Sequence, residues 1–307
     1  MTPTAATPTA ISVRDLSKVY GERRAVSHAT FEVPLGSICG FVGPNGSGKT
    51  TTIRMLLGLI EASGGAGEVL GYPISDPAKY LPAVGAMIEG PAFYPALTGA
   101  ENLKVLATMG GFPLERVDEL LTVVGLEDRA KSKYKTYSLG MKQRLGIAAA
   151  LLPHPKLLIL DEPTNGLDPS GIQEIRNLLK ALAENGTSVF VSSHLLSELE
   201  MIAEYLVMLR EGEVIFFGKT DELLHAQSSF IALATEYEVD QKRLLDTLLG
   251  ADFSAEIREG RIHVDAPREA SAQLNRIAFE AGITLTEIVI EKPTLEETFF
   301  DMTGDKK

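Results

Sequence analysis

The chain has 307 residues, of which 45% are apolar and 23% are charged, values typical of a globular protein with about two domains. Its 29 basic and 41 acidic residues give a net charge of −12, which argues against nucleic acid as the main partner because phosphate binding requires a basic surface. The single cysteine, Cys39, excludes an intramolecular disulfide framework and fits a reducing compartment. No apolar run is long enough to span a membrane, and residues 1–10 lack the features of a signal peptide. We therefore expect a soluble, cytoplasmic protein whose first ten residues form a disordered tail.

The first segment with a regular pattern covers residues 11–42. Its apolar and polar residues alternate around turns at Gly21 and Gly36, which predicts antiparallel strands. Residues 37–42 form a nearly continuous apolar run, as expected for a strand that is buried on both faces. A glycine-rich loop follows, and the apolar residues of the segment 51–60 then fit a helix packed against a sheet.

A helical insertion at about residues 90–150 separates this region from an α/β pattern. Residues 156–160 and 187–193 are short apolar runs that predict buried strands. Residues 171–186 and 195–206 have the apolar spacing of helices. Strands that alternate with helices in this way predict a parallel sheet with right-handed crossovers.

The pattern changes again near residue 229. From there to residue 307 the chain reads as strand, helix, two short strands, helix and strand, which is the order of a ferredoxin-like α+β unit. We interpret residues 229–307 as a small accessory domain, most simply a packing or dimerisation module.

Residues 43–50, GPNGSGKT, match the phosphate-binding sequence G-x-x-x-x-G-K-[ST] between a predicted strand and a predicted helix. The glycines let the backbone curl so that successive N–H groups point at phosphate oxygens, and the helix that begins near Lys49 adds its positive end. Lys49 supplies a charge for the β- and γ-phosphates, and Thr50 offers a hydroxyl to Mg²⁺. The alternative is a glycine-rich turn without a ligand. We expect the phosphates of a nucleotide to be bound by Gly43, Pro44, Asn45, Gly46, Ser47, Gly48, Lys49, Thr50 and Thr51.

Two acidic residues, Asp161 and Glu162, follow the predicted strand at 156–160. In parallel sheets, ligands bind outside the carboxyl ends of the strands. Asp161 can hold Mg²⁺ there, commonly through water, and Glu162 can orient or deprotonate an attacking water. Alternatively, the two charges simply mark the end of a strand. His194 follows the strand at 187–193 and would reach the same edge, where it could contact the γ-phosphate; a purely structural role is the alternative.

A third motif, YSLGMKQRL at residues 137–145, resembles the signature sequence of ABC-type ATPases, the nucleotide-binding subunits of ABC transporters. The resemblance covers residues 11–220 and implies a P-loop NTPase fold with an antiparallel β subdomain and a helical subdomain. It also implies hydrolysis of Mg-ATP, and a dimer in which Ser138, Leu139 and Gly140 face the ATP held by a second protomer. A helix N-cap without a ligand is the alternative.

The resemblance assigns roles to three further residues. Tyr20 lies where the family has an aromatic ring stacked on adenine, with a buried sheet tyrosine as the alternative. Asp168 belongs to the loop that communicates with the opposite site. His194 matches the family's switch histidine and completes the implied catalytic set with Glu162 and Lys49.

Two residues depart from the family pattern. Glu89 replaces the glutamine that usually senses Mg²⁺ and the γ-phosphate. A carboxylate coordinates Mg²⁺ more strongly but repels phosphate oxygens, and the resemblance implies that Glu89 is a Mg²⁺ ligand beside Thr50 and Asp161. Leu139 puts a side chain where the signature backbone is usually bare. Glu89 and the sequence around it resemble the bacitracin- and lantibiotic-type exporters, as does the C-terminal sequence at 292–304.

We therefore expect an ATPase whose ATP-driven dimer closure powers a separate membrane-spanning permease, with export of a drug, antibiotic or peptide. It would pair with a second ATPase protomer, most simply an identical one, and would lie on the inner face of the membrane through the permease. The segment 89–97 is the expected socket for a helix of that permease. The alternatives are a soluble ABC-fold ATPase with a non-transport role and a regulatory module with impaired catalysis.

Overall fold

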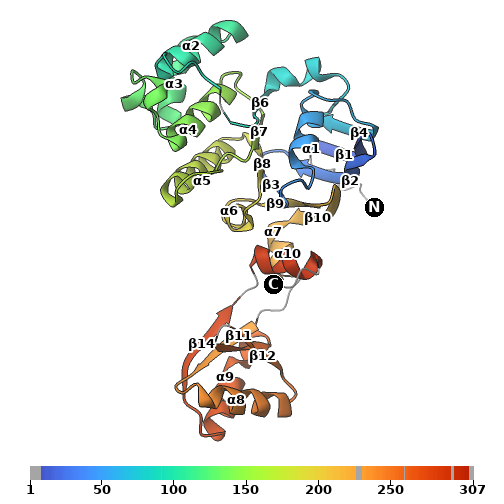
Figure 1. Ribbon diagram of the computed structural model, residues 1–307, viewed down its shortest axis with the longest axis vertical. Coiled ribbons are helices and arrows are strands. Elements are labelled where there is room, and N and C mark those ends of the chain that lie inside the picture. Colours follow the sequence, from blue (N-terminus) through green and yellow to red (C-terminus); the bar gives the residue numbers. More distant parts are fainter. Residues whose placement is uncertain (1–7, 91, 226–229, 259, 292–293, 304–307) are drawn as a thin grey trace, which may run out of the picture. The chain divides into compact units, whose positions relative to one another are not determined.

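The computed structural model describes residues 8–90, 92–225, 230–258, 260–291 and 294–303, and the chain divides into two compact units, residues 1–220 and 221–307. Figure 1 colours them along the sequence, from blue through yellow to red. Most of the expected disordered tail, residues 1–7, lies outside the described residues. The expectation is wrong for Thr9 and Ala10, because Thr9 pairs with Pro34 in a sheet and Ala10 is fully buried.

Two sheets form the framework of the N-terminal unit. The first is antiparallel, has the order β2-β1-β4-β5, and consists of β1 (Thr9–Tyr20), β2 (Arg23–Pro34), β4 (Gly64–Val69) and β5 (Tyr72–Pro73). The second has the order β10-β9-β3-β8-β7-β6 and consists of β3 (Ile38–Val42), β6 (Val84–Met87), β7 (Leu157–Asp161), β8 (Ser188–Ser193), β9 (Tyr205–Arg210) and β10 (Glu213–Lys219). Its strands are parallel except for β10 at one edge. Both predicted kinds of sheet are therefore present.

Seven helices are described in the N-terminal part of the chain, the last of which continues into the second unit. They are α1 (Lys49–Leu56), α2 (Gly99–Gly110), α3 (Arg116–Val123), α4 (Leu139–Ala150), α5 (Pro169–Glu184), α6 (Leu196–Glu200) and α7 (Thr220–His225). Short 3₁₀ turns cover Pro77–Lys79, Leu81–Ala83, Glu127–Arg129 and Tyr134–Thr136. Helices α2, α3 and α4 pack together as the group drawn in green in Figure 1.

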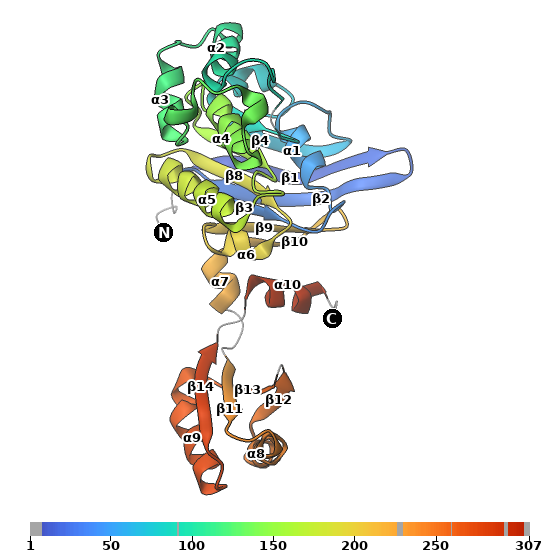
Figure 2. The same ribbon diagram turned by 60° about the vertical axis from the view of Figure 1, so that its left-hand side comes forward.

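The core of the N-terminal unit lies between its two sheets and includes α1. Phe31 of β2, Phe41 of β3 and Phe190 of β8 form a cluster with ring centroids 5.8, 6.2 and 4.9 Å apart. Helix α5 packs against β3 and β8 and runs along the larger sheet in Figure 2. Strands β3, β7 and β8 are fully buried, which explains their continuous apolar sequences.

The structure differs from the prediction in the segment after His194. The helix expected over residues 195–206 ends at Glu200, and Tyr205–Arg210 forms strand β9 instead. Strands β9 and β10 make a hairpin through Glu211 and Gly212, whose φ angles of 51° and 87° suit a tight turn of the I′ kind. Apolar spacing alone does not separate a short helix from a buried strand; the pairing of β9 with β3 decides the outcome.

The C-terminal unit is a four-stranded antiparallel sheet with the order β12-β13-β11-β14. Helices α8 and α9 cover one face of the sheet, as Figure 2 shows, around a core that includes Ile231, Leu244 and Leu274. This strand order and the alternation of elements give the predicted ferredoxin-like topology. The elements are β11 (Phe230–Thr235), α8 (Val239–Gly250), β12 (Ser254–Arg258), β13 (Arg261–Asp265), a 3₁₀ turn (Arg268–Ala270), α9 (Ser271–Glu280), β14 (Leu285–Glu291) and α10 (Leu295–Thr303).

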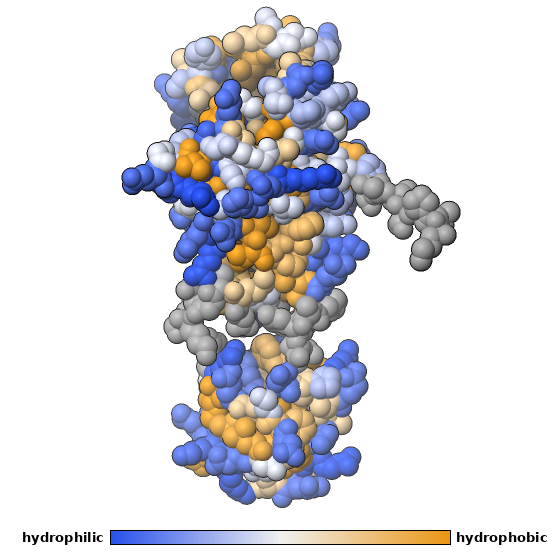
Figure 3. Space-filling view, turned by 90° about the vertical axis from the view of Figure 1, so that its right-hand side faces the viewer, coloured by the Kyte–Doolittle hydropathy of each residue, from blue (hydrophilic) through white to orange (hydrophobic). Residues whose placement is uncertain are grey.

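The molecular surface carries both polar and apolar side chains. On the face shown in Figure 3, each unit has an area of apolar side chains beside hydrophilic ones. Among the described residues, none of the helices combines the length and the apolar character that crossing a bilayer requires.

Candidate active site

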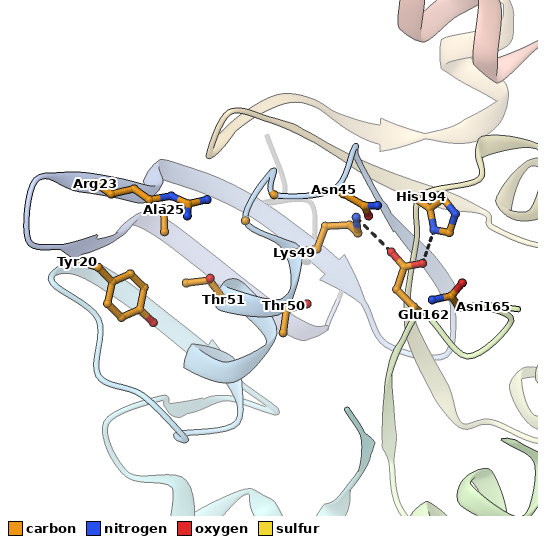
Figure 4. A pocket seen from close by; sticks show the side chains of 12 residues that line it. Tyr20, Arg23, Ala25, Asn45, Lys49, Thr50, Thr51, Glu162, Asn165 and His194 are labelled. Atoms are coloured by element: carbon orange, nitrogen blue, oxygen red, sulfur yellow. Dashed lines mark hydrogen bonds and ion pairs between the residues drawn. The ribbon is translucent and has the colours of Figure 1, made fainter. Parts of the chain in front are cut away.

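A cavity of about 550 Å³ lies where the phosphate-binding loop meets the ends of strands β7 and β8. Figure 4 shows Tyr20 and Arg23 at one end of the cavity and Glu162, Asn165 and His194 at the other, with the start of α1 between them. The described residues that line it are Tyr20, Arg23, Ala25, Asn45, Gly46, Gly48, Lys49, Thr50, Thr51, Glu162, Asn165 and His194. Residues of the phosphate-binding loop therefore share one cavity with Glu162 and with His194, which follow two different strands.

The loop between β3 and α1 has the backbone conformation that its glycines allow. Gly46 and Gly48 have φ angles of 83° and 109°, in the region that favours glycine. A Cβ atom at Gly43 would lie 2.3 Å from the carbonyl oxygen of Leu209, so no larger residue fits there. Lys49 folds back along the loop, and its Nζ donates to the carbonyl oxygen of Gly43 at 2.7 Å. The loop is thus shaped as the phosphate-binding motif predicts.

Asp161, at the end of β7, is buried and held by two hydroxyl groups. Its Oδ2 accepts a hydrogen bond from Thr50 Oγ1 at 2.8 Å, and its Oδ1 accepts one from Ser192 Oγ at 2.6 Å. Thr50 and Asp161 were both predicted to bind Mg²⁺, and their oxygen atoms are the kind of ligand that this ion prefers. Among the described residues, no group of three or more His, Cys, Asp or Glu side chains could hold a metal. Thr50 and Asp161 remain predicted Mg²⁺ ligands.

Glu162 contacts the two other predicted catalytic residues. Its Oε1 lies 3.2 Å from Lys49 Nζ, and its Oε2 lies 2.5 Å from His194 Nδ1, as the dashed lines of Figure 4 mark. Because an ionised carboxylate only accepts hydrogen bonds, Nδ1 of His194 is the donor. Glu162 has a φ angle of 50°, which is uncommon outside glycine, and its N–H donates to the carbonyl oxygen and the Oγ of Ser192 at 3.2 and 3.0 Å. These bonds fix the backbone from which the carboxylate enters the cavity.

Tyr20 and Arg23 border the other end of the cavity, on either side of the β1–β2 turn. Tyr20 is 48% exposed, so the alternative of a buried sheet tyrosine does not apply. The Nζ atom of Lys18 lies 5.1 Å from the centre of the Tyr20 ring. Sequence reasoning did not name Arg23 or Ala25 as lining residues; the only available signal was their position directly after a turn beside Tyr20.

The predicted signature residues lie outside this cavity. Ser138 is the N-cap of α4, and its hydroxyl accepts the N–H of Met141 at 3.3 Å. Leu139 is 46% exposed, and its Cδ2 would lie 3.1 Å from a Cβ built on Gly166, so it packs against the loop that follows β7. Gly140 follows at the same helix end. In this single chain the three residues form an exposed helix start rather than part of the cavity wall.

Four further predicted nucleotide ligands are not among the described residues that line the cavity: Gly43, Pro44, Ser47 and Asp168. Asp168 is the N-cap of α5, and its Oδ1 accepts the N–H of Gly171 at 3.0 Å. The buried hydroxyl of Ser47 has no hydrogen-bond partner among the described residues.

Glu89, predicted as a third Mg²⁺ ligand, forms an ion pair with Arg54 of α1. Glu89 has a φ angle of 59° and is not among the described lining residues of the cavity. The sequence analysis did not name Arg54 as a partner, because the two residues come from segments that only the fold brings together. A role of Glu89 at the metal would require it to leave Arg54.

Comparisons with known proteins point to one family. Residues 26–165 match the family model described as ABC transporter. The bacitracin transport ATP-binding protein BcrA of Bacillus licheniformis is 39% identical over 303 residues, which cover 96% of this chain and 98% of that protein. The lantibiotic transport ATP-binding protein SrtF of Streptococcus pyogenes is 41% identical over 211 residues, covering 69% of this chain and 91% of that protein.

A solved structure supports the same assignment. The dimeric post-hydrolysis state of the ATP-binding cassette MJ0796, bound to ADP and Pi, has a TM-score of 0.61 and is 26% identical, covering 68% of this chain and 98% of that one. The likeness to BcrA extends over both units of this chain, whereas the likeness to the solved cassette covers a share close to that of the N-terminal unit. Taken with the three motifs and the shared cavity, these findings show that the chain belongs to the ATP-binding proteins of ABC transporters, which are ATPases.

Proposed function

We propose that this ATPase hydrolyses Mg-ATP in the cavity between Tyr20 and His194 and so powers export through a separate membrane-spanning permease. The observation that carries the proposal is the position of Glu162, held between Lys49 and His194 at the end of the cavity where the β7 and β8 strands stop. The likeness to bacitracin and lantibiotic transport proteins supports transport as the process that hydrolysis drives.

The lining residues suggest how the substrate lies in the cavity. The exposed ring of Tyr20 offers a flat apolar face for the adenine base. The backbone N–H groups of residues 45–50 and the N-terminus of α1 suit the phosphates. Lys49 is only 6% exposed and already lies beside Glu162, so its charge would meet the terminal phosphate next to the candidate base.

In the proposed reaction, the oxygen of a water molecule attacks the γ-phosphorus while Glu162 accepts a proton from that water, and ADP leaves with the electrons of the broken P–O bond. The hydrogen bond from His194 orients the carboxylate of Glu162. Thr50 and Asp161 would hold Mg²⁺, which supplies positive charge to the phosphate oxygens. Glu89 would join them once it leaves Arg54.

A second ATPase protomer, identical or different, is proposed to complete the site by placing residues 138–140 on the ATP bound here. Two observations support this: the start of α4 is exposed and lies outside its own cavity, and a solved relative of this chain is a dimer bound to ADP and Pi. Asp168 and the loop before it would lie at the same interface. Closure of two such protomers on ATP, and reopening after hydrolysis, would be the event that drives the permease.

The partner in the membrane is proposed to be a permease that moves a drug, an antibiotic or a peptide outward, with this chain on its cytoplasmic side. The names of the relatives support this substrate class. The cargo itself would be selected by the permease. Isolation of the tagged chain from solubilised membranes, with identification of the proteins that accompany it, tests this part; recovery with ribosomes instead would favour the non-transport alternative.

The role of Glu162 has a direct test. The change Glu162→Gln keeps the size and the hydrogen-bonding oxygen of the side chain but removes the base, so we expect ATP binding to persist and turnover to fall by about 10²-fold or more. Steady-state phosphate release and binding of a fluorescent ATP analogue measure the two effects. The exposed Glu184, changed to Gln, is the matched control. Parent-like turnover in Glu162→Gln would remove Glu162 from the role of base.

A further inference from the structure

A buried carboxylate with no part in the proposed reaction is bonded to the segments that follow β7 and β8. Glu198 belongs to α6 and is 7% exposed. Its Oε2 accepts hydrogen bonds from Thr164 Oγ1 at 2.5 Å and from Ser193 Oγ at 3.3 Å. Its Oε1 has no hydrogen-bond partner among the described residues. Removing a carboxylate from water is costly when its hydrogen bonds are incomplete, so a gain in stability does not account for Glu198.

The two hydroxyl groups that Glu198 binds belong to the two segments that carry catalytic groups. Thr164 lies in the loop that leaves β7, two residues after Glu162. Ser193 is the last residue of β8 and directly precedes His194. Its Oγ also accepts the backbone N–H of the residue after His194, at 3.0 Å. Glu198 therefore joins the exits of both strands, and it is not among the described residues that line the cavity.

Other contacts between the two exits act at a different point. Glu162 donates from its backbone to Ser192, and Ser192 donates to Asp161. These bonds fix the start of the loop after β7. They do not hold the chain beyond Ser193, where His194 and the short helix α6 follow. A helix of five residues is not stable by itself, and α6 has no side-chain cap at Leu195. Glu198 is a buried polar anchor of this segment.

We propose that Glu198 is a positioning residue for hydrolysis, which sets the place of His194 relative to Glu162 by holding Thr164 and Ser193 together. The proposal rests on the proposed roles of Glu162 and His194. Nδ1 of His194 and Oε2 of Glu162 are 2.5 Å apart, so a movement of about 1 Å would break their hydrogen bond. Errors of this size in the position of a catalytic group cost about 10²-fold in rate. Glu198 does not line the cavity, so the binding of ATP should not depend on it.

The test compares the rate of hydrolysis with the affinity for nucleotide in the full chain. For Glu198→Ala we expect kcat to fall roughly 10-fold or more, while the Kd of a fluorescent ATP analogue changes less than about 3-fold. Glu198→Gln keeps an oxygen that accepts from both hydroxyls and should recover most of kcat. Thr164→Val removes one of the two donors and should give an intermediate rate. The exposed Glu204, changed to Ala, is the control for loss of a charge nearby.

A double-mutant cycle separates positioning from a general structural effect. If Glu198 acts through His194, the change Glu198→Ala should slow the parent but slow the His194→Ala variant by less than about 2-fold further. The buried thiol of Cys39 reports folding in every variant, because it should react with a thiol reagent only when the chain unfolds. If Glu198→Ala does not fold, Thr164→Val replaces it in the cycle, because it removes one of the two hydrogen bonds with little change of shape, and Glu198→Gln is the variant expected to keep most of kcat.

Three results would overturn the inference: a parent-like kcat in Glu198→Ala, equal slowing in the parent and in the His194→Ala background, or a loss of nucleotide affinity as large as the loss of rate. A failure of the proposed function would give a different result from these three. If the parent protein bound ATP but did not hydrolyse it in any preparation, including with its membrane partner, the proposed function would fail and this inference with it.

Discussion

Lys49 is almost buried, and its ammonium group is shared between the carbonyl oxygen of Gly43 and the carboxylate of Glu162. A buried cation needs partners of opposite charge or strong dipoles. The phosphates of ATP would offer such partners, so Lys49 should contribute much of the affinity for nucleotide.

The change Lys49→Ala should therefore weaken the binding of ATP by roughly 10-fold or more, since it removes a charge-assisted contact with a phosphate. Equilibrium titration with a fluorescent ATP analogue measures the loss. Lys180→Ala, which removes an exposed lysine from α5, should bind like the parent. Equal affinity in the Lys49 and Lys180 variants would show that Lys49 does not contact the nucleotide.

The burial of Cys39 predicts how its thiol reacts. It is the single cysteine of the chain and is fully buried in β3, and burial raises the pKa of its thiol far above the ordinary value. A raised pKa leaves less thiolate at any given pH, and the thiolate is the reactive form. The native protein should therefore not react with a thiol reagent at pH 8, whereas the chain unfolded in guanidinium should show one reactive thiol. Rapid reaction of the native protein would contradict the buried position of β3.

At the residue scale, the sequence predicts a site residue when its position follows from the pattern of one short segment. The phosphate loop and the pair Asp161 and Glu162 belong to this class, because a strand end or a glycine turn is a local feature. The contacts of Arg54 with Glu89 and of Thr164 with Glu198 were not predictable. They join segments that are far apart in the sequence, and no local pattern specifies such pairs.

At the scale of elements, β9 shows why local patterns fail. Its sequence, YLVMLR, lies between β3 and β10, and its four central residues are all apolar and buried, so no alternation indicates an exposed face. The helix predicted there ends early because residues 205–208 pair with residues 39–42 of β3, and only a strand conformation lets the backbone groups of both segments pair in this way. The fold of the C-terminal unit was easier to predict, since its strands and helices alternate with clear turns.

The helical insertion contains a structured segment that precedes α2. The ring of Phe93 packs against Tyr134, with ring centroids 5.2 Å apart. The backbone of Tyr94 is held by buried Asn102, whose Oδ1 accepts its N–H at 2.8 Å and whose Nδ2 donates to its carbonyl oxygen at 3.1 Å. The Tyr94 side chain nevertheless is 61% exposed. A rigid backbone that presents an exposed aromatic ring fits the proposed contact with a helix of the permease.

The change Tyr94→Asp should therefore abolish coupling to transport while leaving the basal hydrolysis of ATP near that of the parent. Phosphate release by the isolated protein and transport in membranes that contain the permease measure the two activities. Tyr237→Asp, which alters an exposed tyrosine of the C-terminal unit, should affect neither. Loss of nucleotide binding in Tyr94→Asp would instead place this residue in the support of the site, and full transport would exclude it from the contact.

At the scale of the whole molecule, the described residues of the cavity belong to one of the two units. The N-terminal unit carries all the described residues of the nucleotide cavity, together with an exposed helix start at residues 138–140 that serves no ligand of its own chain. The C-terminal unit has its own core and the ferredoxin-like topology. The cavity was predictable because its motifs are local. The partner of the exposed helix start was expected only from the family, since one chain does not contain it.

The most direct measurement is a structure of the Glu162→Gln variant with ATP and Mg²⁺, in which slow turnover preserves the substrate. We predict a dimer that encloses two nucleotides, each held by the phosphate loop of one copy and contacted at its γ-phosphate by residues 138–140 of the other. ATP contacted by one copy alone, with those residues far from any phosphate, would contradict the account.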